Sequence, residues 1–215
     1  MLMLANPHIG VANTQGLYLG HRKVHDLPEQ AWELRQRLLM NRQVTTAVFE
    51  NPPRHILTEG LVYDRCQVGV VTGVPKAHGL EDLYITEDEQ MFNVVRTQVD
   101  VVLREGVAVI NALEPAAADL ADLCDGEVIY CGGSADLPHV AAHLAQGGRA
   151  VLCVGQQPMM CTGDQSRPVF EQAQHSCSAN GTLQQVLLTA VATAWALEVP
   201  LSVIRAGIDV GLPTL

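Results

Sequence analysis

The feature that most constrains the fold is a short, uniformly apolar run inside a mixed stretch, REGVAVINALEP at residues 104–115. Four consecutive apolar residues at 107–110 predict a strand buried on both faces, as in a parallel sheet. Asn111 follows at the carboxyl end of this strand, and Pro115 stands where a helix can begin. The stretch therefore predicts a strand, a polar exit and a helix. In open α/β sheets this edge is where ligands bind.

Asn111 has two interpretations. Its side-chain amide can donate and accept hydrogen bonds at once, as a group that contacts a nucleobase edge must. Its place ahead of a helix also suits a side chain that caps that helix. Position alone favours the helix cap. The residues at the neighbouring strand ends are therefore needed to distinguish a helix cap from a nucleobase contact.

Strand and helix patterns alternate along the chain. Residues 9–24 predict a strand followed by a hairpin about Gly20, and residues 155–180 predict short hairpins and loops. Strands are predicted at 44–50, 67–74, 107–110, 127–131 and 149–154, and helices at 28–41, 86–103, 115–124, 137–146, 181–197 and 200–206. This alternation predicts an α/β fold with a doubly wound, mostly parallel sheet flanked by helices. We expect residues 1–215 to form a single domain.

Two local signals set helix ends in this prediction. Thr86 and Glu89 have the spacing of a capping box at the start of the long helix. Gly207 is expected to stop the last helix after Ala206.

Composition narrows the class of protein. The formal net charge is −10, and the chain contains only two lysines, Lys23 and Lys76. This argues against a surface that binds nucleic acid phosphates. No apolar run is long enough to cross a bilayer, and no basic segment precedes the first apolar residues. We therefore expect a soluble cytoplasmic protein with neither nucleic acid nor membrane partners.

Cysteines and histidines offer no clear metal site of their own. The six cysteines include no CxxC pair, so a zinc site is not indicated and free structural thiols are expected. His139 and His143 lie four residues apart on a predicted helix, a spacing that can bind a metal. The alanines around them suit a helix that packs on a sheet with these histidines on a partly exposed face.

Polar residues at other strand ends join Asn111. Glu50 closes one predicted strand, and Thr72 and His78 follow the next. The carboxyl ends of parallel strands share one edge of a sheet, so a carboxylate, a hydroxyl and an imidazole are expected there. Glu50 is the natural hard-oxygen ligand for Mg²⁺ in such a nucleotide site. A solvated strand end at Glu50 and a loop histidine at His78 are the alternatives.

Phosphate-binding signals are missing from the sequence. A phosphate loop needs glycines followed by Lys and Ser or Thr, and neither lysine stands in that pattern. No GxGxxG is present either. The chain is expected to have no nucleotide-phosphate cradle of its own.

Five stretches in order resemble the ATP-binding central domain of Mur-type ligases, and most closely the carboxyl-terminal half of cyanophycin synthetases. The stretches are NTQGLYLGHRKV (13–24), TTAVFENPPRHILTEGLVYDRCQVGVVTGV (45–74), VAVINALEP (107–115), AAHLAQGGRAVLCV (141–154) and AWALEVPLSVIRAGI (194–208). The similarity spans roughly residues 9–208. It implies a P-loop-NTPase-like sheet.

The resemblance also implies a chemistry. Ligases of this family phosphorylate a carboxylate with ATP and Mg²⁺, and an amine then attacks the acyl phosphate. By position, Asn111 corresponds to the adenine contact, Thr72 lies beside it in the nucleotide site, and Glu50 and His78 correspond to Mg²⁺ ligands.

The sequence also departs from the family pattern. The phosphate loop is expected before residue 9, where eight residues are available, and the third, amine-binding domain is not expected. Gly73 replaces the family asparagine, Ala77 the aspartate, and Val95 lies near an expected lysine. Where the family pattern has a flexible run containing glycines, this chain has residues 51–55. The two positions that are acidic in the pattern hold Leu113 and Glu114.

Three hypotheses follow. The first is a ligase-family pseudoenzyme that does not turn over ATP as this isolated chain. The second is a binding or assembly module that pairs with a complete ligase, and the third is one chain of a split ligase. An exposed sheet edge could also drive formation of a homo-oligomer.

Overall fold

The fold is described from a computed structural model that covers residues 2, 6, 8–26, 32–170 and 181–211. The strands are β1 (Ile9–Asn13), β2 (Gly16–Leu19), β3 (Arg22–His25), β4 (Thr46–Phe49), β5 (Cys66–Val71), β6 (Val102–Asn111), β7 (Glu127–Cys131), β8 (Arg149–Val154), β9 (Gln157–Thr162) and β10 (Gln165–Pro168). The helices are α2 (Trp32–Met40), α3 (Pro53–Glu59), η1 (Glu81–Leu83), α4 (Asp88–Asp100), α5 (Ala117–Asp122), α6 (Pro138–Ala145), α7 (Gly181–Ala196) and α8 (Leu201–Gly211).

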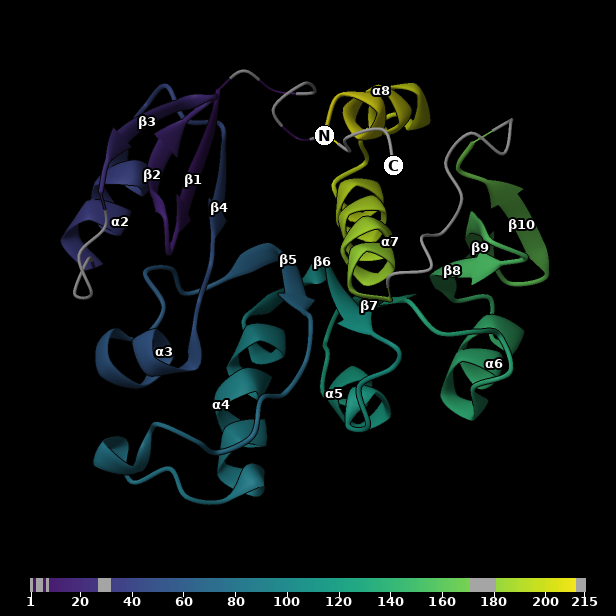
Figure 1. The fold of residues 1–215 in the computed structure, drawn as a ribbon, viewed down its shortest axis with the longest axis horizontal. Helices are drawn as coiled ribbons and strands as arrows, with labels where there is room; N and C mark the ends of the chain where they lie inside the picture. Colours follow the sequence, from purple (N-terminus) through teal and green to yellow (C-terminus); the bar gives the residue numbers. More distant parts are fainter. Residues whose placement is uncertain (1, 3–5, 7, 27–31, 171–180, 212–215) are drawn as a thin grey trace.

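The strands form two sheets (Figure 1). The larger has the order β10-β9-β8-β7-β6-β5, with β5 to β8 parallel and β9 and β10 antiparallel. The smaller has the order β3-β2-β1-β4, in which β1 and β4 are parallel. The predicted mostly parallel α/β sheet is confirmed, and so are the hairpin about Gly20 and a hairpin, β9–β10, within residues 155–180.

Helices cover both faces of the larger sheet, which confirms the doubly wound architecture. On one face α7 crosses β5 to β8, and Leu188 and Val191 pack there against Val109 and Ile129. On the other face lie α4, α5 and α6 (Figure 1). Because β6 and β7 are covered on both sides, their central residues are fully buried. No helix in the described ranges has both the length and the hydropathy that crossing a membrane requires.

The central strand is longer than the sequence predicted. β6 begins at Val102, which pairs with Cys66, and the register shifts before Val68 pairs with Val107. Residues 104–106, ahead of the strand predicted at 107–110, are therefore an irregularity inside a longer strand. An added Cβ at Gly106 would lie 2.6 Å from the Gln67 carbonyl oxygen, so the backbones approach closely at this point.

The structure differs from the predicted helices at α3 and α8. Helix α3 was not predicted, and Pro53 occupies its first turn, where proline is tolerated. Helix α8 continues through Gly207 to Gly211. Burial of Ile204 and Ile208 offsets the ~1 kcal/mol cost of a helical glycine.

The capping box of α4 lies one residue later than predicted. It joins Glu87 and Gln90, because the Gln90 side-chain oxygen accepts from the backbone N–H groups of Glu87 and Thr86. Helix α2 is described from Trp32, and the predicted start at residues 28–31 lies outside the described residues.

Replacing Gly69 of β5 by alanine tests the packing of α4 on the sheet. An added Cβ would lie 2.4 Å from the Gln98 carbonyl oxygen and 2.7 Å from Val102 Cγ2. We expect Gly69→Ala to lower the free energy of unfolding by about 1–3 kcal/mol, measured by urea denaturation. Gly181→Ala, where nothing lies within 4 Å, is the control and should change it by less than about 1 kcal/mol. Equal stability of the two variants would contradict this packing.

Candidate functional site

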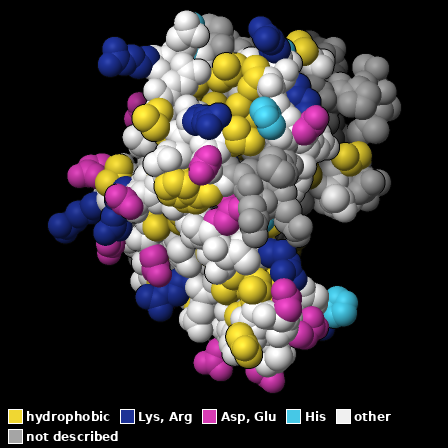
Figure 2. All heavy atoms as spheres, turned by 90° about the vertical axis from the view of Figure 1, so that its left-hand side faces the viewer, with side chains coloured by type: hydrophobic (Ala, Val, Ile, Leu, Met, Phe, Trp, Pro, Cys, Tyr) yellow, Lys and Arg dark blue, Asp and Glu magenta, His cyan; other side chains and the backbone are white. Residues whose placement is uncertain are grey.

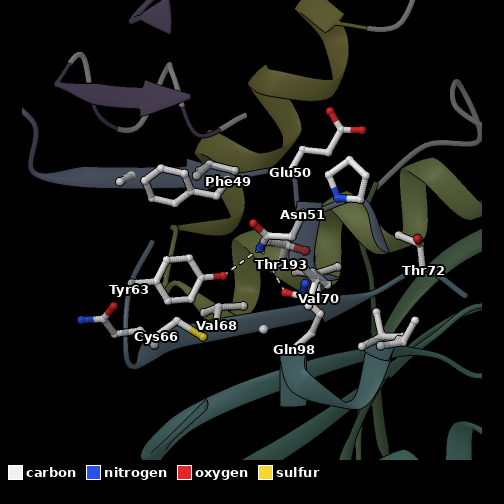
Figure 3. Close-up of a pocket in the computed structure, with 18 of the residues that line it drawn as sticks. Phe49, Glu50, Asn51, Tyr63, Cys66, Val68, Val70, Thr72, Gln98 and Thr193 are labelled. Carbon is white, nitrogen blue, oxygen red and sulfur yellow. Dashed lines mark hydrogen bonds between the residues drawn. The ribbon is translucent and has the colours of Figure 1, made fainter. Parts of the chain in front are cut away.

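A cavity of about 1100 Å³ lies between β4 and β5, the two strands at which the sheets face each other (Figure 3). Its walls are consecutive residues of both strands and their exits, 46–50 and 66–72. Side chains of α4 and α7, including Val95 and Thr193, also line it. The cavity therefore spans the full length of both strand edges.

A polar cluster crosses this cavity. The Asn51 side-chain amide donates to Tyr63 Oη at 2.9 Å and to Gln98 Oε1 at 3.2 Å, and Figure 3 shows the three side chains converging. The Tyr63 ring also lies 5.6 Å from the Phe49 ring. Burial raises the pKa of Tyr63, so its hydroxyl stays protonated and can accept from Asn51.

Two carboxylates stand where β4 and β5 end. Glu50 Oε2 accepts from the Thr14 backbone N–H at 2.6 Å, and Glu114 Oε2 accepts from the Val74 N–H at 2.7 Å. Both glutamates line the cavity. The second oxygen of each has no hydrogen bond among the described residues, so this end of the cavity presents negative charge.

Thr72 and Asn111 are brought together as predicted for neighbouring strand ends. Asn111 Nδ2 donates to the Thr72 carbonyl oxygen at 2.9 Å, and Asn111 Oδ1 accepts from the Leu113 N–H at 3.0 Å. The bond from the Leu113 N–H closes a local turn at the exit of β6. A side chain that caps a helix accepts a backbone N–H in a similar way. The amide thus links β5 to β6, and its assignment as an adenine contact stays a prediction.

His78 lies apart from these groups. It is 94% exposed and its Nδ1 is 3.8 Å from Glu81 Oε1. It is not among the residues that line the cavity with Glu50. Across the described ranges, no three His, Cys, Asp or Glu side chains gather closely enough to hold a metal ion.

The His139 and His143 pair has a packing role. His139 Nε2 contacts the Ala112 carbonyl oxygen at 3.0 Å, and the Arg149 N–H donates to His143 Nε2 at 3.1 Å. Both rings pack edge-on against Tyr130. These contacts hold α6 on the sheet, as expected for a helix that packs there. Both rings are part-buried, in keeping with the partly exposed face that was predicted.

The cysteines only partly fulfil the expectation of free thiols. Cys66, Cys124, Cys131 and Cys161 are free, but Cys153 is disulfide-bonded, which corrects that expectation. Cys66 lines the cavity, and burial raises its pKa to about 11. Its thiol is therefore protonated near neutral pH and is a poor nucleophile.

Sequence reasoning missed the cluster of Asn51, Tyr63 and Gln98. Asn51 is 12 residues from Tyr63 and 47 from Gln98 along the chain, and no spacing marks them as neighbours. They meet through the fold, because Asn51 follows β4, Tyr63 precedes β5 and Gln98 lies on α4.

The residues present do not fit a magnesium triphosphate. Arg65 is the cationic side chain among the described residues that line the cavity, and it stands at the amino end of β5 beside Cys66. The carboxyl end holds Glu50 and Glu114, which can ligate Mg²⁺ but cannot hold phosphate oxygens. A nucleotide at this edge would need its phosphates held by groups that these residues do not supply.

Sequence comparison finds relatives among cyanophycin synthetases. The chain is 34% identical over 145 residues to the cyanophycin synthetase of Geminocystis herdmanii, covering 67% of this chain and 16% of that protein. It is 26% identical over 204 residues to that of Trichormus variabilis, covering 93% of this chain and 22% of that protein. The chain thus spans less than a quarter of these relatives. No protein-family profile matches it.

Solved structures with a similar fold are Mur ligases. A UDP-N-acetylmuramoyl-L-alanyl-D-glutamate–2,6-diaminopimelate ligase aligns over 100% of this chain and 43% of its own, with a TM-score of 0.64 and 13% identity. A UDP-N-acetylmuramate:L-alanyl-gamma-D-glutamyl-meso-diaminopimelate ligase from Neisseria meningitides aligns over 95% and 58%, with a TM-score of 0.55 and 15% identity. These likenesses concern the fold.

Replacing Asn111 by aspartate tests its role as a link between strands. The carboxylate keeps the acceptor for Leu113 N–H but loses the donor to the Thr72 carbonyl. We expect Asn111→Asp to lower the free energy of unfolding by about 1–3 kcal/mol at neutral pH. Asn41→Asp is the control, because the Asn41 oxygen accepts from Gln43 N–H at 3.0 Å and its loss of a donor breaks no described bond. An Asn111→Asp protein as stable as this control would argue against the link.

Proposed function

Since this chain is a Mur ligase-like domain related to cyanophycin synthetases, we propose that it is a non-catalytic member of that ATP-dependent ligase class. By itself it does not turn over ATP. Its relatives imply ATP and Mg²⁺ dependence for the class in general, that is, formation of an amide through an acyl phosphate.

The lack of a cation among the described cavity residues at the carboxyl ends of β4 and β5 carries this proposal. Phosphoryl transfer depends on cations and backbone donors that hold the phosphates and neutralise developing charge. Here Glu50 and Glu114 face that region, and Arg65 lies at the opposite end of β5. The described residues at this end therefore offer the phosphates no cation.

Internal substitutions support the same conclusion. Gly73 and Ala77 stand where the family pattern has an asparagine and an aspartate. Pro52 and Pro53, within the run that replaces the family's flexible glycines, lead into the rigid first turn of α3. Fold-determining residues have been kept while residues of the site have changed, as expected when a domain loses catalysis.

What remains of the nucleotide site is proposed to be its adenine end. Asn111 and Thr72 are the proposed contacts to the base, and Glu50 and His78 are the positions that correspond to Mg²⁺ ligands. Because the Asn111 amide is already bonded to Thr72 and Leu113, a base would have to displace one of these bonds. We therefore expect weak adenosine binding.

Among the described residues, β4 and β5 each have one unpaired edge, which favours a second candidate function. A domain with open strand edges is suited to assembly with another chain. The chain could pair with a complete ligase, or contribute one half of a ligase split over two chains.

Nucleotide binding and turnover distinguish a non-catalytic domain from an active ligase. We expect the purified 215-residue protein to show no Mg²⁺-dependent release of phosphate from ATP above a buffer blank. Calorimetry should find that adenosine binds at least as tightly as ATP, since phosphates gain nothing from an acidic strand end.

A matched variant guards against a contaminating ATPase. Any turnover that persists in Glu50→Gln comes from another protein, whereas turnover that this variant removes belongs to the chain. Turnover of the second kind, or ATP binding about tenfold tighter than adenosine binding, would overturn the proposal.

A further inference from the structure

Helix α2 carries exposed apolar side chains on its outer side. Trp32, Leu39 and Met40 are 38%, 43% and 73% exposed. Residues 32, 36 and 40 follow one another at four-residue spacing along one side of the helix, and Leu39 borders them. Helix α2 lies beside the smaller sheet at the left-hand end of Figure 1, and Figure 2 shows this side of the molecule with apolar groups at the surface. An apolar stripe therefore lies on the outside of the domain.

The inner side of α2 is fixed by packing. Leu38 is buried in a cluster with Ala12 and Leu17 of the smaller sheet. Arg35 is 3% exposed, and its Nη2 lies 2.6 Å from His55 Nδ1 on α3. Because these contacts lie on the side of the helix opposite the stripe, the helix cannot turn its apolar side inward without breaking them. The stripe is thus held at the surface.

Two opposite charges border the stripe. Glu33 and Arg37 are both exposed and lie one helical turn apart, on the side of the stripe away from Leu39. Within the described residues, neither of them forms an ion pair shorter than 4.0 Å. Both charges are therefore able to contact another molecule.

Two copies of α2 match each other when they cross antiparallel at Gln36. Trp32 of each copy then meets Met40 of the other, and Glu33 of each copy lies near Arg37 of the other. A parallel crossing would place Glu33 against Glu33 and Arg37 against Arg37, and like charges repel. The surface is thus self-complementary in one orientation, as a two-fold interface requires.

We propose that this side of α2 is an interface between two copies of this chain, with the two-fold axis at Gln36. We name it the α2 face, which consists of Trp32, Glu33, Gln36, Arg37, Leu39 and Met40. The proposal involves neither the nucleotide site nor the edges of β4 and β5. It can therefore fail or succeed independently of the function proposed above.

The size of the α2 face predicts a weak dimer. The helix has nine residues and is about 14 Å long. Stable interfaces bury about 1,200–2,000 Å² in total, more than one short helix from each copy supplies. The net charge of −10 on each copy also opposes association. We expect a dissociation constant of about 10–100 μM.

Other occupants and other surfaces match less well. An anionic membrane surface attracts a helix whose polar side is basic, and Glu33 on the α2 face opposes such binding. Tyr84 is 87% exposed, but the neighbouring Glu81 and Asp82 would place like charges together in a contact between two copies. Trp and Met are enriched at protein interfaces, and the α2 face joins both to a pair of opposite charges.

Sedimentation equilibrium of the 215-residue protein, at about 1–500 μM, tests the proposal. We expect Arg37→Glu to weaken the dimer at least about tenfold, because each copy then presents two acidic groups to the other. Arg104→Glu makes the same change of charge at an exposed arginine on β6 and is the control. It should change the dissociation constant less than about twofold.

A mixture of charge variants separates a contact between copies from damage to the fold. Glu33→Arg alone should weaken the dimer as Arg37→Glu does. Mixed in equal amounts, the Glu33→Arg and Arg37→Glu proteins should form a dimer with one copy of each, because the two α2 faces then carry opposite charges. A variant that had lost its fold would not be rescued in this way, and circular dichroism checks each one.

Cross-linking tests the position of the two-fold axis. Cysteines introduced by Gln36→Cys lie at the axis, so copper phenanthroline should join two copies through a disulfide. Gln15→Cys, at an exposed glutamine in the β1–β2 turn, is the control. It should give no more covalent dimer than the native cysteines give in the unaltered protein.

Several results would overturn the proposal. They are a protein that stays monomeric at about 500 μM, equal effects of Arg37→Glu and Arg104→Glu, no dimer in the mixture, and equal cross-linking of the two cysteine variants. A monomer that binds phosphatidylglycerol vesicles, and loses this binding in Arg37→Glu, would assign the α2 face to a lipid surface instead.

Discussion

The parallel pairing of β5, β6 and β7 is the interaction on which the rest of the structure depends. Val109 and Ile129 sit in register and pack against α7, while Ile110 and Tyr130 face α4 and α6. Burial on both faces fixes the register, because a slip of one residue would exchange the two faces. The strand ends are thereby aligned, which brings Thr72 and Asn111 within hydrogen-bonding distance.

The sequence predicted those parts of the fold whose signals are local. Apolar runs such as 107–110 identified the strands, and their alternation with helices identified the doubly wound sheet. Elements that depend on tertiary contacts were missed or misplaced. Helix α8 continues through Gly207 because Ile204 and Ile208 are buried, and burial cannot be deduced from a glycine alone.

Prediction of the candidate site succeeded to the same limited extent. Placing Thr72 and Asn111 side by side required only the order of the strands. The Asn51, Tyr63 and Gln98 cluster, and the buried Arg35 whose Nη2 lies 2.6 Å from His55 Nδ1, join residues far apart in sequence with no periodic mark.

The acidic strand ends and the open edges together describe a ligase-like domain whose fold is kept. Glu50 and Glu114, at the carboxyl ends of β4 and β5, can ligate Mg²⁺ but supply no cation for phosphates. Within the described residues, β4 and β5 each leave one edge unpaired, on either side of the cavity.

Amide hydrogen exchange along β5 and β6, followed residue by residue by NMR in the protein alone, tests this arrangement most directly. Successive N–H groups of a strand point to opposite sides, so an edge strand is bonded at alternate residues. The account predicts alternating slow and fast exchange along β5 and uniformly slow exchange along residues 107–111 of β6. Uniformly slow exchange along β5 would show that its outer edge is already paired and would contradict the open edge.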